Sequence, residues 1–146
     1  MEHRGRGCFG VMVICVAVLP IDAGEAATWT VRCKKDVITD HVNCTVADRH
    51  LMLFFDNSDR PTSVCIYPHD FPGRQAVVRI SKGQPHYTTF KSCMFAYHVF
   101  DEMLLGTKYV VQFTRWPYDF PVDGQGSLKG LGKAIKKVSV ERDRLQ

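Results

Sequence analysis

The sequence predicts a small, mainly β domain with an antiparallel sandwich or barrel-like architecture, one or two packed helices and disulfide staples. Three observations favour this class. Short segments alternate between apolar and polar residues, and clusters of Gly, Pro, Asn, Asp and Ser separate these segments. Of the six cysteines in the chain, four follow the N-terminal apolar run, and an even number suits an exported, disulfide-bonded domain.

The first 26 residues have the three-part layout of a secretory signal peptide. Arg4 and Arg6 precede an apolar run from Cys8 to Pro20, and small residues then lead to Ala26. This run is shorter than the roughly 20 residues that a membrane-spanning helix needs. We therefore expect cleavage near Ala26 and a periplasmic or secreted location.

Cleavage would divide the chain into a signal peptide, residues 1–26, and a single β-rich exported domain, residues 27–146. The chain has 19 basic and 15 acidic residues, of which two and three precede the cleavage point, so 17 and 12 remain and the net charge becomes +5. This charge mildly favours anionic partners, such as lipid headgroups or polyanionic saccharides, although it also serves solubility.

Alternating segments predict the strands. In the first segment, Trp29, Val31 and Cys33 alternate with Thr30 and Arg32, a period of two that is typical of a half-buried strand. Similar segments follow at 44–47, 51–55, 63–67, 75–81 and 86–91. Turn-forming residues separate several of them, at 56–62, 68–73 and 82–85.

A first helix is predicted over residues 94–105, and Gly106 offers a C-terminal stop. On a helical wheel its apolar side chains fall on one half, opposite three polar ones. The apolar half comprises Phe95, Val99, Phe100, Met103 and Leu104. We expect this helix to cover one end or one face of the sheet.

A strand is predicted over 107–115, and the loop 116–126 follows it. This loop places Trp116, Tyr118 and Phe120 among prolines and a glycine. Aromatic side chains restrained by proline are suited to stacking on sugar rings or to filling a partner's pocket, which makes the loop a candidate binding site. The favoured alternative is a wide hairpin whose aromatic residues cap the open end of the core.

A second helix is predicted to begin at Ser127, a good N-cap residue, and to run to about Val138. One face is apolar and comprises Leu128, Leu131, Ala134, Ile135 and Val138. The other face is basic and carries Lys129, Lys133, Lys136 and Lys137. We expect the apolar face to pack on the sheet with the lysines in water, and weak contact of this basic face with an anionic membrane surface is the alternative.

The four remaining cysteines allow three pairings. Cys33 and Cys44 lie in consecutive strand-like segments, so a hairpin would bring them together. We therefore expect a disulfide between them and, by elimination, a second one between Cys65 and Cys93. A crosslink that closes a loop of about a dozen residues stabilises a domain by roughly 3 kcal/mol in the chain-entropy model.

The sequence lacks the patterns of a zinc metalloprotease, a serine-hydrolase nucleophile elbow and a phosphate-binding loop. The nearest catalytic arrangement is Cys93 with His86 or His98, because a neighbouring histidine can turn a thiol into a nucleophile. In an oxidising compartment, half of a disulfide is the simpler interpretation of Cys93. We therefore predict no catalytic residue.

Cys33, His41, Cys44 and His50 offer enough ligands for a tetrahedral zinc ion. Their spacing differs from that of paired zinc-finger ligands, and two exported cysteines are expected to oxidise first. We predict no metal and no cofactor. A nucleic-acid partner is not expected either, because the basic residues are dispersed and no recognition motif occurs.

A set of short landmarks spans nearly all of the domain. Trp29, Val31 and Cys33 open it, and Cys44 follows. Later come the Phe-x-x-Cys segment of Phe90 and Cys93, an apolar helix into Gly106, a strand, and the Ser-Leu-Lys-Gly element at 127–130. In this order the landmarks resemble the invasion-associated locus B family.

The chain departs from that family at two places. Residues 95–98 stand where members usually carry Gly-Cys, so Cys93 needs another partner, for which Cys65 is available. Leu131 stands where an aromatic residue usually follows the Ser-Leu-Lys-Gly element. The resemblance implies a small, mostly β, periplasmic or outer-membrane-associated bacterial protein linked to host-cell invasion or envelope function, without catalysis.

We therefore predict a binding or envelope-interaction protein rather than an enzyme, with an envelope or host protein or a saccharide as its partner. The aromatic loop is the first candidate contact surface and the basic face is the second. Two other classes stay open. One is a small periplasmic hydrolase or thiol enzyme, and the other is a secreted inhibitor that presents the same loop to its target.

Overall fold

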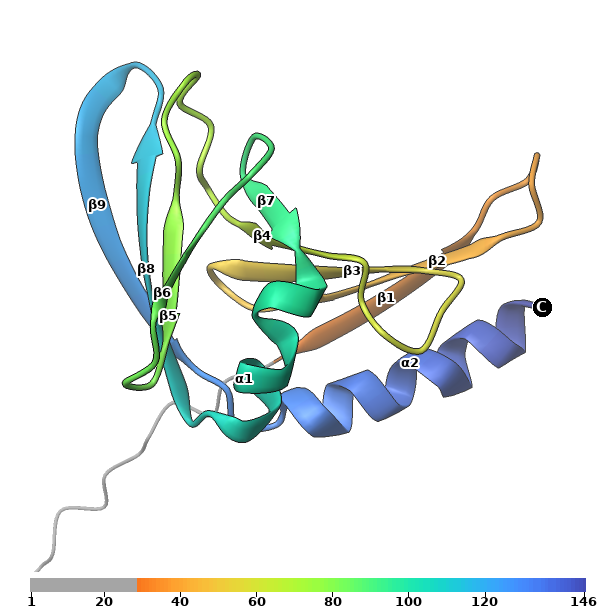
Figure 1. Cartoon of the computed structure of the whole chain (residues 1–146). Coiled ribbons are helices and arrows are strands. Elements are labelled where there is room, and N and C mark those ends of the chain that lie inside the picture. The colour runs from red at the N-terminus through yellow and green to blue at the C-terminus, as the bar shows by residue number, and fades with distance from the viewer. Residues whose placement is uncertain (1–28) are drawn as a thin grey trace, which may run out of the picture.

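The computed structural model describes residues 29–146, so the predicted signal peptide lies outside the described residues. Two antiparallel sheets and two α-helices form this part of the chain, and Figure 1 shows the sheets at a steep angle to one another. The predicted mainly β class is confirmed. The arrangement is sandwich-like, and the sheets do not close into a barrel.

The larger sheet has five strands in the order β1-β2-β3-β4-β7. These strands are β1 (Thr30–Lys35), β2 (Val42–Ala47), β3 (Leu51–Asp56), β4 (Ser63–Ile66) and β7 (Cys93–Phe95). The smaller sheet has four strands in the order β6-β5-β8-β9. They are β6 (Pro85–Tyr87), β5 (Val77–Ile80), β8 (Lys108–Arg115) and β9 (Tyr118–Ser127). The helices are η1 (Ala96–His98), α1 (Phe100–Leu105) and α2 (Leu131–Leu145).

Alternation along the strands builds the core. Every second side chain of β2, β3 and β8 is buried: Val42, Cys44, Val46, Leu51, Leu53, Phe55, Tyr109, Val111 and Phe113. Each large apolar side chain contributes about 1.5–3 kcal/mol when it leaves water. The strands predicted in the N-terminal half and over 107–115 are therefore present, with small differences in their bounds. The strand predicted over 86–91 ends at Tyr87.

Both predicted disulfides are present, and each joins directly opposite residues of neighbouring strands. Cys33 of β1 faces Cys44 of β2, with Cα atoms 4.0 Å apart, and Cys65 of β4 faces Cys93 of β7, at 3.9 Å. The first pair lies on the face that also carries the buried Phe55. The second pair is in register with Met52, on the opposite face. The two disulfides thus staple opposite faces of one sheet.

The terminal helix packs on β1 and β2 and buries Leu131, Ala134 and Val138, as its apolar pattern predicted. Its predicted start at Ser127 is wrong. Ser127 ends β9, and Gly130 precedes the helix with φ 87°, a left-handed conformation that favours glycine. The helix also continues past Val138 to Leu145.

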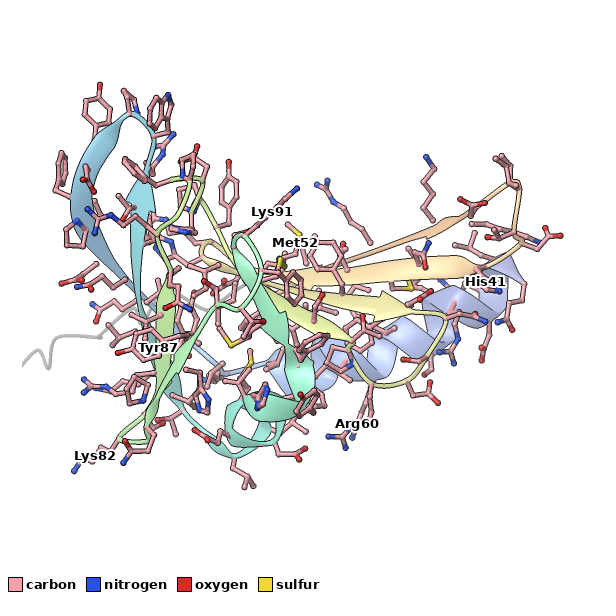
Figure 2. All side chains as sticks on the ribbon, turned by 45° about the horizontal axis from the view of Figure 1, so that its top comes forward. His41, Met52, Arg60, Lys82, Tyr87 and Lys91 are labelled. Carbon is pink, nitrogen blue, oxygen red and sulfur yellow. A yellow bond between two sulfur atoms is a disulfide. The ribbon has the colours of Figure 1, made fainter. Side chains whose placement is uncertain are left out.

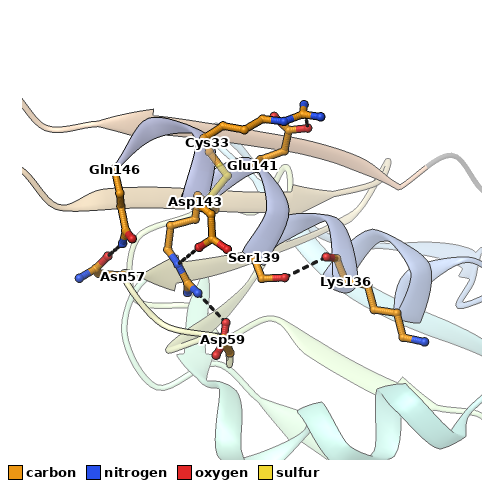
Figure 3. Close-up of a disulfide and its surroundings, with 11 residues drawn as sticks. Cys33, Asn57, Asp59, Lys136, Ser139, Glu141, Asp143 and Gln146 are labelled. Carbon is orange, nitrogen blue, oxygen red and sulfur yellow. Dashed lines mark hydrogen bonds and ion pairs between the residues drawn. A yellow bond between two sulfur atoms is a disulfide. The ribbon is translucent and has the colours of Figure 1, made fainter.

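Polar contacts tie the last turns of α2 to the turn between β3 and β4. Arg142 Nη2 lies 2.7 Å from Asp59 Oδ1, and Gln146 Nε2 donates to Asn57 Oδ1 at 3.4 Å. Figure 3 shows both contacts beside the Cys33 disulfide. These contacts hold the end of α2 against the turn between β3 and β4.

The helix predicted over residues 94–105 is confirmed in part: it begins two residues later than predicted and is divided into η1 and α1 at Val99. Met94 lies in β7, because pairing with β4 and the Cys65–Cys93 bond hold this segment extended. Only the short helices η1 and α1 follow, and Phe95 is exposed rather than packed. The predicted stop at Gly106 is confirmed, since α1 ends there.

The loop predicted over residues 116–126 is also wrong, because most of it forms strand β9. Pro121 is tolerated because it pairs with Thr114, whose backbone N–H and C=O point to another loop, so the position needs no N–H toward β8. Gly124 faces Val111, and a Cβ atom there would lie 2.8 Å from the His50 ring. The glycine therefore leaves room for a side chain and does not mark a turn.

Tyr109 joins the two sheets. Its side chain is fully buried, and its hydroxyl donates a hydrogen bond to Asp48 Oδ2 in the turn between β2 and β3. Asp48 Oδ1 accepts the backbone N–H groups of His50 and Leu51, at 3.0 and 2.9 Å. Burial and the Asp48 hydrogen bond together raise the pKa of Tyr109 far above its usual value, so the phenol stays protonated and donates.

Neither α-helix in residues 29–146 is both long and apolar enough to cross a membrane.

Candidate binding surface

The end of the β8–β9 hairpin carries a group of large aromatic side chains. Trp116, Tyr118 and Phe120 expose 62%, 62% and 57% of their surface. Phe71, from the loop between β4 and β5, lies against Trp116 with ring centroids 5.4 Å apart. We call these four residues the aromatic tip, and Figure 1 shows this end of the hairpin clear of the five-stranded sheet. The expectation that the loop aromatics cap the core is therefore wrong.

Backbone hydrogen bonds hold the aromatic tip in place. The Trp116 N–H donates to Asp70 Oδ1 at 2.7 Å. In return, the N–H groups of Asp70 and Phe71 both donate to the carbonyl of Thr114, at 3.3 Å each. The loop between β4 and β5 is thus fastened to the hairpin directly below Trp116, which gives the aromatic surface a fixed backbone.

A buried histidine reinforces the same loop. The N–H of Thr114 donates to His69 Nδ1 at 3.1 Å, and His69 Nε2 lies 3.0 Å from the carbonyl of Arg74. Because Nδ1 accepts the hydrogen bond from Thr114, Nε2 carries the hydrogen and donates to the Arg74 carbonyl. His69 thereby connects Arg74, near the other end of the loop, with Thr114 of the hairpin.

An exposed ion pair also connects the loop between β4 and β5 with β9. Arg74 Nη2 lies 2.8 Å from Asp119 Oδ2, one residue beyond Tyr118. The hydrogen bond and the charge of Asp119 raise the pKa of Arg74 above its usual value. Because both groups are exposed, water weakens this pair, and its main role is to position the two side chains at the surface.

A second aromatic cluster lies on another part of the molecule. Phe90 contacts Phe95 at 5.3 Å between centroids, and Phe95 stacks on Tyr97 at 5.7 Å. Tyr97 is 71% exposed. This cluster lies on the loop before β7, on β7 and on η1, so it provides matched exposed aromatic residues outside the aromatic tip.

The basic face of α2 is exposed, as predicted. Lys129 precedes the helix, and Lys133, Lys136 and Lys137 lie on its outer side. In Figure 1 the helix runs along the opposite side of the molecule from the hairpin end. The structure therefore keeps the two predicted contact surfaces apart.

The two reactive arrangements considered from the sequence are not assembled. Cys93 is bonded to Cys65, and Cys33 to Cys44, so these sulfurs are not thiolates. His41 lies in the β1–β2 turn, at the far end of the larger sheet in Figure 2. Within residues 29–146, no group of three or more His, Cys, Asp or Glu side chains is placed to hold a metal ion.

Sequence reasoning missed the residues that support the aromatic tip. His69, Asp70 and Phe71 belong to a segment that we interpreted only as a turn. The available signal was the mixture of an acidic, an imidazole and an aromatic side chain within it. Their partners lie 45 and 46 residues away in the chain, so pattern alone does not reveal them.

Comparison with known proteins identifies no relative. No family model matches the chain, and no curated protein or solved structure is significantly similar to it. The functional argument therefore rests on the surface itself.

Proposed function

We propose that this protein is an exported binding protein of the bacterial cell envelope, periplasmic or secreted, that contacts its partner through the aromatic tip. Two disulfides indicate an oxidising, extracytoplasmic environment. The signal-peptide pattern and the resemblance to invasion-associated locus B proteins support the finer location, and the resemblance favours a role in host-cell or envelope interaction.

The exposure of the aromatic tip carries the proposal. Trp116, Tyr118 and Phe120 leave more than half of their surface in water, although burial of large aromatic side chains is strongly favourable. Asp70 and Arg74 fix the segments that present them. A rigid aromatic surface loses little conformational entropy on binding, which is typical of the anchor residues of an interface.

Export is the first test. The protein recovered from the extracytoplasmic fraction of its own cells is expected to begin at Ala27 and to contain no titratable thiol. N-terminal sequencing and intact mass measure the first property, and alkylation under denaturing conditions measures the second. A full-length cytoplasmic protein with free thiols would contradict the location and with it the proposal.

Site-specific crosslinking is the second test. A photoreactive amino acid at position 118 is expected to capture a partner in living cells, whereas the same group at position 97 captures none. Tyr118 and Tyr97 are similarly exposed, at 62% and 71%, so exposure alone cannot produce a difference. Substitution of Trp116→Ala in the position-118 protein is expected to lower the adduct yield about tenfold or more, as for an anchor residue.

The same experiment addresses stability. Because Trp116 is exposed, Trp116→Ala is expected to change the free energy of unfolding by no more than about 0.5 kcal/mol. Equal adducts at positions 118 and 97, or a large loss of stability without loss of capture, would contradict a binding role for the aromatic tip. A captured protease would favour the inhibitor alternative, because the tip would then be the inhibitory segment.

A further inference from the structure

We infer that the cleft beside the aromatic tip binds an uncharged oligosaccharide. This inference rests on the proposed function, because it names the class of ligand that the same end of the molecule recognises. Four observations support it: the size of the cleft, the chemistry of its walls, its prearranged polar groups and the adjoining aromatic rings.

The cleft consists of two neighbouring cavities. The larger, about 630 Å³, lies between the loops 69–75 and 88–92. The smaller, about 240 Å³, lies over β8 and β9 beside Pro121. Arg74 and Gln75 line both cavities. The larger cavity alone is within the usual size range of small-molecule sites, and the two shared residues place the smaller cavity directly beside it.

The walls offer hydrogen-bonding groups of both kinds. The residues that line the larger cavity include Asp70, Gln75, Thr89 and Ser92, whose side chains carry a carboxylate, an amide and two hydroxyls. The smaller one adds the amide of Gln112. A sugar hydroxyl donates one hydrogen bond and accepts others, so a ligand rich in hydroxyls matches a wall that mixes acceptors and donors. A purely apolar ligand would leave these groups unsatisfied.

The charges of the cleft nearly cancel. Asp119 neutralises Arg74 at 2.8 Å, and Asp70 offsets Lys91, which stands on the loop between β6 and β7 in Figure 2. Phosphate or polyanion sites concentrate positive charge instead. The net positive charge of the whole chain is therefore not focused here, which favours an uncharged saccharide over an acidic one.

Several of the lining groups are held in place before any ligand arrives. Gln75 Nε2 donates to the carbonyl of Thr88 at 2.8 Å, which fixes the amide and leaves its oxygen available. The buried Thr88 hydroxyl accepts the N–H of Ala76 at 3.0 Å. Asp70 uses only Oδ1 to hold Trp116, so Oδ2 remains available as an acceptor. Groups fixed in this way lose little entropy when a ligand binds.

Aromatic rings continue the cleft toward solvent. Phe71 lines the larger cavity and also packs against Trp116. The faces of a sugar ring that carry only C–H groups stack favourably on such side chains. The arrangement therefore provides a polar wall for hydroxyls and an aromatic surface for the ring faces of successive sugar units.

The test uses the disulfide-bonded protein on an array of neutral, N-acetylated and uronic-acid oligosaccharides. Binding to at least one neutral or N-acetylated oligosaccharide is expected, and titration of that compound then gives its Kd. Asp70→Asn keeps the acceptor for Trp116 and changes the other carboxylate oxygen to a donor, so it is expected to raise the Kd about tenfold. Thr89→Val removes one exposed hydroxyl and is expected to raise the Kd by about three- to tenfold.

The control variants remove the same kinds of group, a hydroxyl and an aromatic ring, from positions outside the cleft and the aromatic tip. Thr30→Val removes an exposed hydroxyl from β1, and Tyr97→Ala removes an exposed aromatic ring outside the aromatic tip, so both are expected to leave the Kd within about twofold. Thermal unfolding of every variant verifies the fold. Absence of binding on the array, preference for uronic-acid compounds, or equal loss in the control variants would overturn the inference.

Failure of this inference is distinguishable from failure of the proposed function. Crosslinking at position 118 could capture a protein whose adduct persists after enzymatic deglycosylation, while no oligosaccharide on the array binds. This pair of results would show that the aromatic tip binds polypeptide. In that case the proposed function stands and the saccharide cleft is wrong. If neither experiment gives a signal, both are wrong.

Discussion

Replacement of Tyr109 by alanine is expected to lower the free energy of unfolding by about 3–5 kcal/mol, among the largest effects of any single substitution in this chain. The side chain is fully buried, so the substitution leaves a cavity between the two sheets. It also removes the hydroxyl that donates to Asp48, in the turn between β2 and β3 of the other sheet. Equilibrium unfolding in urea measures the loss.

The hydroxyl and the ring contribute separately. Tyr109→Phe keeps the packing and leaves Asp48 Oδ2 without its donor, at an expected cost of about 1–3 kcal/mol. Asp48 keeps its bonds to the N–H groups of His50 and Leu51, so the turn between β2 and β3 is expected to remain intact. The difference between the phenylalanine and alanine variants then reports the ring alone.

Substitution of Gly126, on the neighbouring strand β9, tests the packing of the Tyr109 ring independently. Gly126 faces Tyr109 across β8 and β9, and a Cβ atom at this position would overlap the phenol. Gly126→Ala is therefore expected to destabilise the protein by about 1–3 kcal/mol. In the Tyr109→Ala background the overlap is absent, so the same substitution is expected to cost almost nothing. This double-mutant cycle isolates the contact from general effects on β9.

Gly132 provides the matched control. A Cβ atom there would meet nothing within 4 Å, and the residue lies in the first turn of α2. Gly132→Ala is expected to be neutral or to stabilise by up to about 1 kcal/mol through helix propensity. Equal costs for Gly126→Ala in both Tyr109 backgrounds would show that the ring does not set the requirement for glycine.

The residue pattern predicted those parts of the fold that alternate locally. β1, β2, β3 and β8 are found where the period of two indicated them, and the Cys33–Cys44 pairing followed from their order. β9 was missed because Pro121, Gly124 and Gly126 are ordinarily signs of a loop. Here Gly124 and Gly126 leave room for the side chains of His50 and Tyr109, and Pro121 is tolerated opposite Thr114, which only the tertiary structure shows.

The helical errors have the same cause. Residues 94–105 satisfy a helical wheel, but the bond from Cys93 to Cys65 and the pairing with β4 override that local preference at β7. The candidate site shows both outcomes. Trp116, Tyr118 and Phe120 were evident from composition, whereas the support from Asp70 depends on a contact across 46 residues.

Loss of either disulfide is expected to destabilise the protein by about 3 kcal/mol, because the crosslinked residues are 11 and 28 positions apart and each bond restricts the unfolded chain. The Cys33→Ala/Cys44→Ala and Cys65→Ala/Cys93→Ala proteins measure this effect with the remaining disulfide intact. Urea unfolding without reductant gives the two free energies.

Serine variants separate the two faces of the sheet. Cys44 is buried and Cys33 packs against the core, so serine hydroxyls there would lack partners and cost about 1–3 kcal/mol more than alanine. Cys65 is buried but lies outside the main core cluster, and Cys93 is partly exposed with the Ser92 hydroxyl 3.7 Å from its sulfur, so the serine penalty at this pair is expected to be smaller. An equal serine penalty at both pairs would contradict the placement of the two disulfides on opposite faces. A larger penalty at the Cys33–Cys44 pair would show that this disulfide also belongs to the packed core beneath α2, in addition to restricting the unfolded chain.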